Sequence, residues 1–133
     1  MTNTHSDFAR ALDRIGRGKY VSVTTYRRDG RAVPTPVGAL VHEGVLYALT
    51  APGTGKVKRI RNNPRVTIAP CAMNGTVPPD APTTPGTARL LDETSTAHVQ
   101  ELMKQRFCMY RLVRMADRML RRERPLVAIA ITR

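Results

Sequence analysis

The chain has 133 residues, 41% of them hydrophobic, and carries 22 Lys and Arg against 10 Asp and Glu, a formal charge of +12. This length predicts one domain over 1–133 with a real core, and the apolar content excludes wholesale disorder. The apolar runs are too short to span a membrane, and the lack of Trp argues against an aromatic stacking platform. The charge favours an anionic partner, with a polyanionic cofactor, nucleic acid and an acidic membrane surface as alternatives.

The chain begins with a predicted helix. Phe8, Leu12 and Ile15 recur at helical spacing after a Ser6-Asp7 cap, so we expect a short helix that ends near Gly16. The residues before Phe8 lack the basic start and apolar stretch of a secretory signal, and we therefore expect a cytoplasmic protein.

A meander of β-strands follows this helix. The predicted strands are 19–27, 32–41, 45–50 and 65–71. Asp29-Gly30 is a strong hairpin turn between the first two. The second strand contains Pro34 and Pro36, whose missing N–H groups would lie on one side of the strand. That side should therefore be a sheet edge or a gap that faces a ligand.

The segment between Thr50 and Pro64 is the most informative part of the chain. Gly53 and Gly55 break the strand that ends at Thr50, and Thr54 can cap a helix that runs from Gly55 to about Asn62. A helix N-terminus offers free N–H groups and a partial positive charge, which suit a phosphate. Lys56 on the first turn can add its ammonium, so the sequence predicts an anion site here.

A nucleotide-binding P-loop is the rival interpretation of this segment. That motif needs Gly, four residues, Gly-Lys, and then Ser or Thr. Here Thr50 stands at the first glycine position and Val57 replaces the hydroxyl that binds magnesium. Both the backbone cradle and the metal ligand are lost, which disfavours a P-loop; a basic surface turn without a ligand stays open.

The second half of the chain completes a barrel pattern. Residues 72–85, rich in Pro, Gly, Thr and Asn, predict a long loop before a strand at 87–91 and a helix at 94–105. The apolar strand 126–132 alternates larger and smaller residues, which suggests burial on both faces. We therefore expect a mainly β, α+β fold: a small antiparallel barrel of six or so strands with flanking helices.

A basic amphipathic segment lies before the last strand. Arg111, Arg114, Arg118 and Arg121 recur at helical spacing within 107–124, beside an apolar face. An ordinary solvated face, a membrane-surface helix, a nucleic-acid contact and a contact with an anionic cofactor tail are the alternatives, and the sequence does not decide among them.

The polar residues form no recognisable catalytic or metal-binding constellation. Cys71 and Cys108 are too few and too far apart for a metal motif, and we expect buried thiols. We expect His42, in a predicted turn, and His98, on a predicted helix, to lie at the surface. No metal is predicted, and any difficult chemistry should belong to a cofactor.

The order of these segments resembles a known family, the pyridoxamine 5′-phosphate oxidase-like split β-barrels, and within it the flavin- and deazaflavin-dependent oxidoreductases. The resemblance covers 19–132, and the segments that carry it are 20–26, 29–31, 33–37, 55–61, 63–66 and 86–89 together with the terminal apolar strand. It implies a homodimer with two cofactor sites at the subunit interface.

The resemblance also implies which residues bind the cofactor. Lys56 should contact a phosphate, with backbone donors from Gly55 and Val57. Thr50 and Ala51 should line the strand end, while Pro36 and Val37 should lie under the ring.

The segment Gly55-Lys-Val-Lys-Arg59 resembles proteins that use the deazaflavin coenzyme F420, so the implied activity is hydride transfer between F420 and a small organic substrate. FMN is the alternative cofactor, and a non-catalytic cofactor carrier and a nucleic-acid-binding module are the alternative functions. The substrate cannot be read from the sequence, and no proton donor is assigned among Tyr26, Tyr47 and Tyr110.

Overall fold

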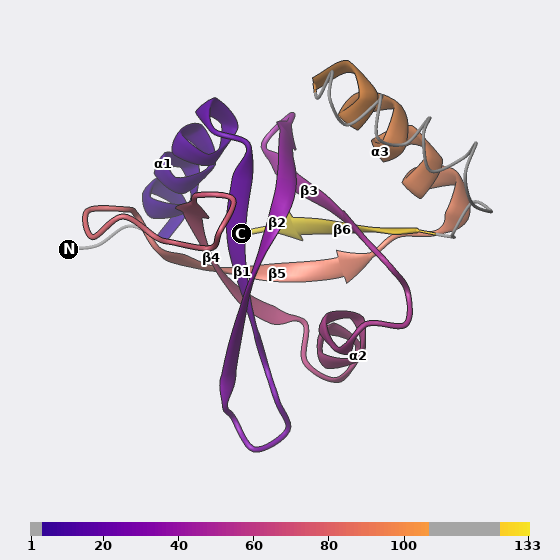
Figure 1. Ribbon diagram of the computed structural model, residues 1–133, viewed down its shortest axis with the longest axis horizontal. Coiled ribbons are helices and arrows are strands. Elements are labelled where there is room, and N and C mark those ends of the chain that lie inside the picture. The colour runs from indigo at the N-terminus through magenta and orange to yellow at the C-terminus, as the bar shows by residue number, and fades with distance from the viewer. Residues whose placement is uncertain (1–3, 107–125) are drawn as a thin grey trace.

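The computed structural model describes residues 4–106 and 126–133, which form a closed antiparallel barrel with three helices in these ranges (Figure 1). The strands follow one another around the barrel in the order β1-β2-β3-β6-β5-β4. The elements are α1 (Thr4–Arg17), β1 (Tyr20–Tyr26), β2 (Ala32–His42), β3 (Val45–Thr50), α2 (Gly55–Asn62), β4 (Arg65–Cys71), β5 (Thr84–Leu90), α3 (Glu93–Arg106) and β6 (Val127–Thr132). The predicted mainly β barrel is confirmed.

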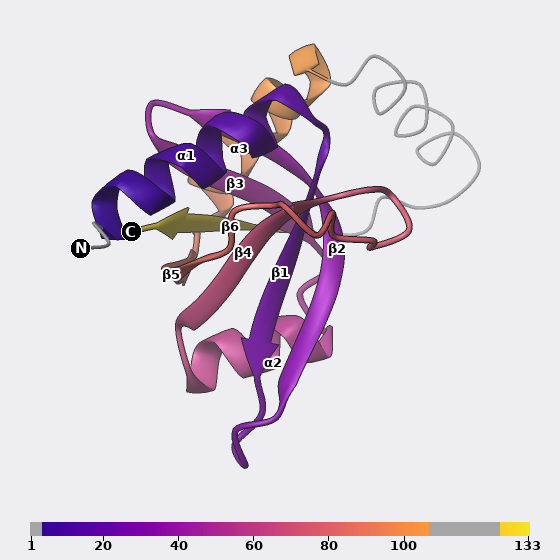
Figure 2. The same cartoon turned by 90° about the vertical axis from the view of Figure 1, so that its left-hand side faces the viewer.

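Strand β2 has two different halves. Its first half pairs only with β1, from Tyr26↔Ala32 to Tyr20↔Gly38, whereas pairing with β3 begins at Ala39. Pro34 and Pro36 lie in the first half, where the side away from β1 needs no backbone donor. The predicted edge at the two prolines is confirmed. Figure 2 shows the β1–β2 hairpin extending beyond the barrel, with α2 beside it.

Strand β5 begins earlier than the sequence predicts. It starts at Thr84 rather than Thr87, so the loop predicted for 72–85 is shorter. Pro85 misled the prediction because proline is rare inside sheets. Here Pro85 pairs with Thr67 of β4, while β6 pairs only from Thr87 onward. Pro85 therefore lies where one side of β5 is free.

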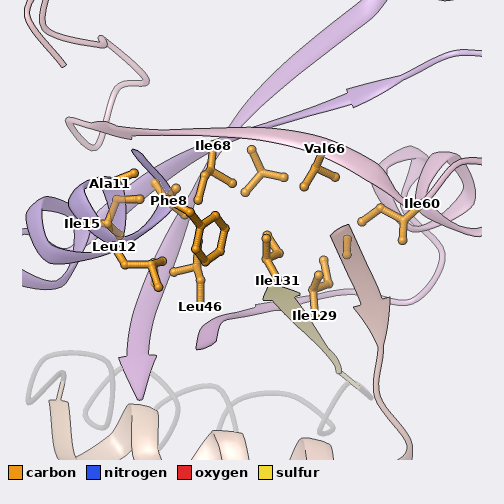
Figure 3. Close-up of a cluster of buried hydrophobic side chains, with 14 residues drawn as sticks. Phe8, Ala11, Leu12, Ile15, Leu46, Ile60, Val66, Ile68, Ile129 and Ile131 are labelled. Carbon is orange, nitrogen blue, oxygen red and sulfur yellow. The ribbon is translucent and has the colours of Figure 1, made fainter. Parts of the chain in front are cut away.

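Helices α1 and α2 lie at opposite ends of the barrel core, as the side chains in Figure 3 show. Helix α1 contributes Phe8, Leu12 and Ile15, and α2 contributes Ile60. Between them the strands supply buried aliphatic side chains, namely Val21, Val23, Leu46, Val66, Ile68, Ile129 and Ile131. Burial of this apolar surface is the main term that stabilises the fold, and it fixes α2 against the barrel.

Helix α3 covers the outside of the barrel. Its Val99 and Met103 are buried against Ala128 of β6, with Leu40 and Leu49 packed alongside. Strand β6 is thus covered on both faces, and Ala128 to Ile131 are all buried. This confirms the prediction for the last strand.

Other predictions have mixed outcomes. The prediction that Cys71 is buried is wrong, because its thiol is half-buried. His98 is exposed, as expected, whereas His42 is the last residue of β2 rather than part of the turn. The Arg111–Arg121 segment and Cys108 lie outside the described residues. Within 4–106 and 126–133, no helix has the length and apolar character to cross a membrane.

Position 86 in β5, occupied by Gly86, is expected not to tolerate a side chain. An added Cβ would lie 3.0 Å from the Thr132 carbonyl oxygen, 3.0 Å from Ile131 Cγ2 and 3.3 Å from Phe8. Because the carbonyl belongs to the neighbouring strand, we expect Gly86→Ala to lower the free energy of unfolding by about 1–3 kcal/mol. Urea unfolding measures this. Gly38→Ala is the matched control, since no atom lies within 4 Å of its added Cβ; an equal loss in both variants would contradict the clash.

Candidate functional site

The turn after β3 builds the N-terminus of α2. Thr54 has extended backbone angles (φ −75°, ψ 159°), and its hydroxyl oxygen accepts the Val57 N–H at 3.4 Å. The same hydroxyl donates to the Ala51 carbonyl at 3.1 Å, which ties the cap to the strand end. The helix ends at Asn62, since Asn63 is extended before Pro64. The predicted helix and its cap are confirmed.

Lys56 points into the protein rather than into solvent. Its exposed fraction is 8%, and its Nζ donates to the Thr50 hydroxyl at 3.2 Å. Thr50 is itself buried at the end of β3, on the same face of the strand as Leu46 and Ala48. Lys56 therefore links the strand end to the first turn of α2 and brings a positive charge to the end of the barrel.

Arg59 adds a second cation on the same helix. Its Nε donates to the Thr25 hydroxyl of β1 at 2.6 Å. Its Nη1 lies 2.7 Å from the position of an added Cβ on Gly55, so the guanidinium lies against the backbone at the helix start. Glycine at this position thus leaves the space that Arg59 occupies.

The two cations have no acidic partner in the described ranges. Neither Lys56 nor Arg59 forms an ion pair there, and their side chains bond to threonine hydroxyls. The pKa of Lys56 lies below its ordinary value of 10.5, first because burial removes water and second because Arg59 is close. Buried charges are normally paired. A bound anion would neutralise both groups and is the natural complement of this site.

Comparison with known proteins places the fold in a family. The family model described as pyridoxamine 5′-phosphate oxidase matches residues 9–133 of the chain. The chain belongs to the pyridoxamine 5′-phosphate oxidase family. No curated protein matches it in sequence.

Solved structures share the fold of this pyridoxamine 5′-phosphate oxidase family member. A provisionally named pyridoxamine 5′-phosphate oxidase from Listeria innocua is 18% identical, with a TM-score of 0.64 over 94% of this chain and 91% of that chain. A protein titled F420 reductase is 19% identical, with a TM-score of 0.57 over 90% of each chain. An FAD-binding protein from Mesorhizobium loti is 16% identical, with a TM-score of 0.56 over 90% of this chain and 82% of that chain.

The fold of this chain brings together only some of the predicted site residues. Thr50 and Lys56 are in contact, and Gly55 and Val57 lie on the same first turn. The Val57 N–H is already bonded to Thr54, so it is not a free donor for a ligand. Ala51 is exposed in the turn, and its carbonyl holds the Thr54 cap.

The two β2 residues of the predicted site face opposite sides of the strand. Val37 packs against the barrel core, whereas Pro36 is exposed beside the turn at Gly75. Their alternation follows from strand geometry. Neither side chain has a described contact with Lys56, so their place under a ring stays a prediction.

Sequence reasoning missed Arg59 and Thr25 as members of the site. Arg59 could have been found, because residues three apart lie on one face of a helix and Lys56 is three residues earlier. Thr25 carries no such signal, since it lies 34 residues from Arg59 in the chain and only the fold brings them together.

The lowered pKa of Lys56 predicts a pH dependence of stability. The unfolded chain keeps the Lys56 proton up to about pH 10.5, whereas the folded protein releases this proton at a lower pH. Between these two values the unfolded state binds more protons, so this group makes the free energy of unfolding rise with pH. From neutral to alkaline pH, the free energy of unfolding of the protein should rise relative to that of its Lys56→Met variant, which lacks this titrating group. Urea unfolding of both proteins measures the difference. A difference that stays constant would contradict the prediction.

Proposed function

We propose that the chain binds a phosphorylated flavin-type cofactor at Lys56 and Arg59 and transfers a hydride between that cofactor and a small organic substrate. The observation that carries the proposal is the pair of cations at the end of the barrel, one of them buried, with no acid bonded to either in the described ranges. A phosphate supplies compact negative charge and several acceptor oxygens, which match an ammonium and a guanidinium.

The roles of the chain's own residues follow from this arrangement. Lys56 and Arg59 hold the phosphate, Thr50 and Thr25 hold the two cations, and Gly55 leaves space for the guanidinium. The cofactor, when bound, supplies the hydride chemistry, so the protein needs to position and desolvate rather than provide a nucleophile. No proton donor is assigned.

F420 is the coenzyme that we propose first. The segment from Gly55 to Arg59 resembles F420-using members of the family, and the formal charge of +12 suits the acidic tail of this coenzyme. The fold shared with a protein titled F420 reductase is consistent with this choice.

FMN is the second candidate, and the cation pair is the observation that favours it. A phosphate monoester carries a charge of about −1.5 to −2 at pH 7, which would balance Lys56 and Arg59 together. The same fold occurs in a structure described as an FAD-binding protein.

A fluorescence titration of F420 against FMN tests the proposal. Saturable binding of either coenzyme that weakens in Lys56→Ala supports it, and the tighter ligand identifies the cofactor. Transfer of hydride from the reduced, bound coenzyme to an acceptor separates an oxidoreductase from a non-catalytic carrier. Failure of both ligands to bind, together with duplex DNA binding that survives moderate salt, would favour a nucleic-acid module instead.

A further inference from the structure

A pocket, called the outer pocket below, opens on the barrel where β1 and β4 separate. The ladder between these strands ends at Thr24↔Thr67, and the first residues of β4 pair with β5 instead. The divergence leaves a hollow of about 290 Å³. Its lining consists of Tyr26, Gly30, Asn63, Arg65, Val66, Thr67 and Pro85.

This outer pocket is separate from the Lys56 and Arg59 site. Thr25 is fully buried and bonds to Arg59, and the next residue, Tyr26, points to the opposite face of β1. Strand β1 therefore stands between the two sites. A ligand in the outer pocket would contact neither Lys56 nor the N-terminus of α2, since neither belongs to its lining.

Two side chains of the outer pocket, those of Asn63 and Arg65, offer hydrogen-bond donors. The Asn63 side-chain oxygen accepts the Arg65 N–H at 3.1 Å, which leaves its NH₂ group to donate. Arg65 is exposed and has no acidic partner among the residues described. Among the residues that the structure describes, no carboxylate lines the hollow, and Asp29 of the adjacent turn is held by Arg31 at 2.8 Å. An acceptor-rich, negatively charged group is thus favoured.

The walls of the outer pocket are partly apolar and fixed. The Tyr26 hydroxyl bonds to the Thr67 hydroxyl at 2.6 Å, which anchors the ring, and Pro85 lies on the same lining. Small-molecule sites begin at about 300 Å³, so this volume suits a ligand of one ring. Arg65 and Tyr26 both belong to the lining, and a guanidinium together with an aromatic ring suits a planar molecule with a carboxylate.

We propose that the outer pocket binds a small aromatic or conjugated carboxylate, with Arg65 and the Asn63 NH₂ group on the carboxylate and Tyr26 beside the ring. Benzoate is the probe, and benzamide is its uncharged match. Ligand-observed NMR titration of the full chain should show saturable benzoate binding, with benzamide at least tenfold weaker.

Matched variants make the test specific to this pocket. Arg65→Ala should weaken benzoate binding at least tenfold, whereas Arg61→Ala, which changes another exposed arginine, on α2, should leave it unchanged. Lys56→Met should also leave it unchanged, because Lys56 lies across β1. The proposal would be overturned if benzamide bound as tightly as benzoate, or if benzoate binding did not saturate. It would also be overturned if Arg65→Ala bound benzoate with full affinity, or if Lys56→Met lost benzoate binding.

Discussion

Lys56→Met is expected to raise the free energy of unfolding of the ligand-free protein while it weakens cofactor binding. Lys56 has an exposed fraction of 8% and only a hydroxyl as its described partner, so the folded state bears a desolvation cost. Met fills similar space without charge and should stabilise the protein by about 0.5–2 kcal/mol. Loss of the charged partner should weaken phosphate binding by about 1–3 kcal/mol, or roughly 5- to 150-fold.

Two measurements on the Lys56→Met variant test whether its stability rises while its cofactor affinity falls. Urea unfolding gives the stability, and fluorescence titration of FMN and F420 gives the affinity. Lys58→Met is the matched control, since Lys58 lies on the same helix but is exposed. A Lys56→Met protein that binds as tightly as the original would remove Lys56 from the site. A loss of stability would show that the buried ammonium is better compensated than its contacts indicate.

Gly55→Ala is expected to weaken cofactor binding without unfolding the protein. The new methyl group would lie 2.7 Å from Arg59 Nη1, and the guanidinium would have to move away from the start of α2. Alanine is otherwise favoured over glycine in a helix, so the stability should hold or rise slightly. Displacing one of two cations should weaken phosphate binding by about 1–3 kcal/mol.

A double-mutant cycle isolates the cause of that effect. If Gly55 acts by leaving space for Arg59, then Gly55→Ala should change affinity little in an Arg59→Ala background. Additive losses in the double variant would instead mean that the helix N-terminus is altered independently of Arg59. Thr25→Val should resemble Gly55→Ala in affinity, because it removes the hydroxyl that holds the guanidinium.

Local signals in the sequence predicted most of the fold. The alternation of Val with Ser and Thr in β1, the Asp29-Gly30 turn and the Thr54 cap each specify their element from a few neighbouring residues. The bounds of β3, α2 and β4 are therefore the predicted ones. The predicted start of β5, Thr87, lies after the observed start at Thr84. Pro85 is tolerated inside the strand because β6 pairs with β5 only from Thr87 onward, and the sequence alone does not show where this pairing begins.

The candidate site was predicted only where its residues are close in the chain. Thr50, Gly55 and Lys56 lie within one turn and its helix, so their proximity could be expected. The direction of the Lys56 side chain could not, because burial against Thr50 depends on how α2 packs on the barrel. The pairing of Arg59 with Thr25 joins a helix to a strand two hairpins earlier, and no local pattern encodes it.

Helix α2 has consequences beyond the site because it also seals one end of the barrel. It has only eight residues, too few to persist without tertiary contacts, and Val57 and Ile60 provide those contacts. Any fluctuation that detaches these two side chains also withdraws Lys56 and Arg59. Amide hydrogen exchange along 57–62 would therefore report how often the end of the barrel opens, and under the proposed function each such opening would also interrupt phosphate binding.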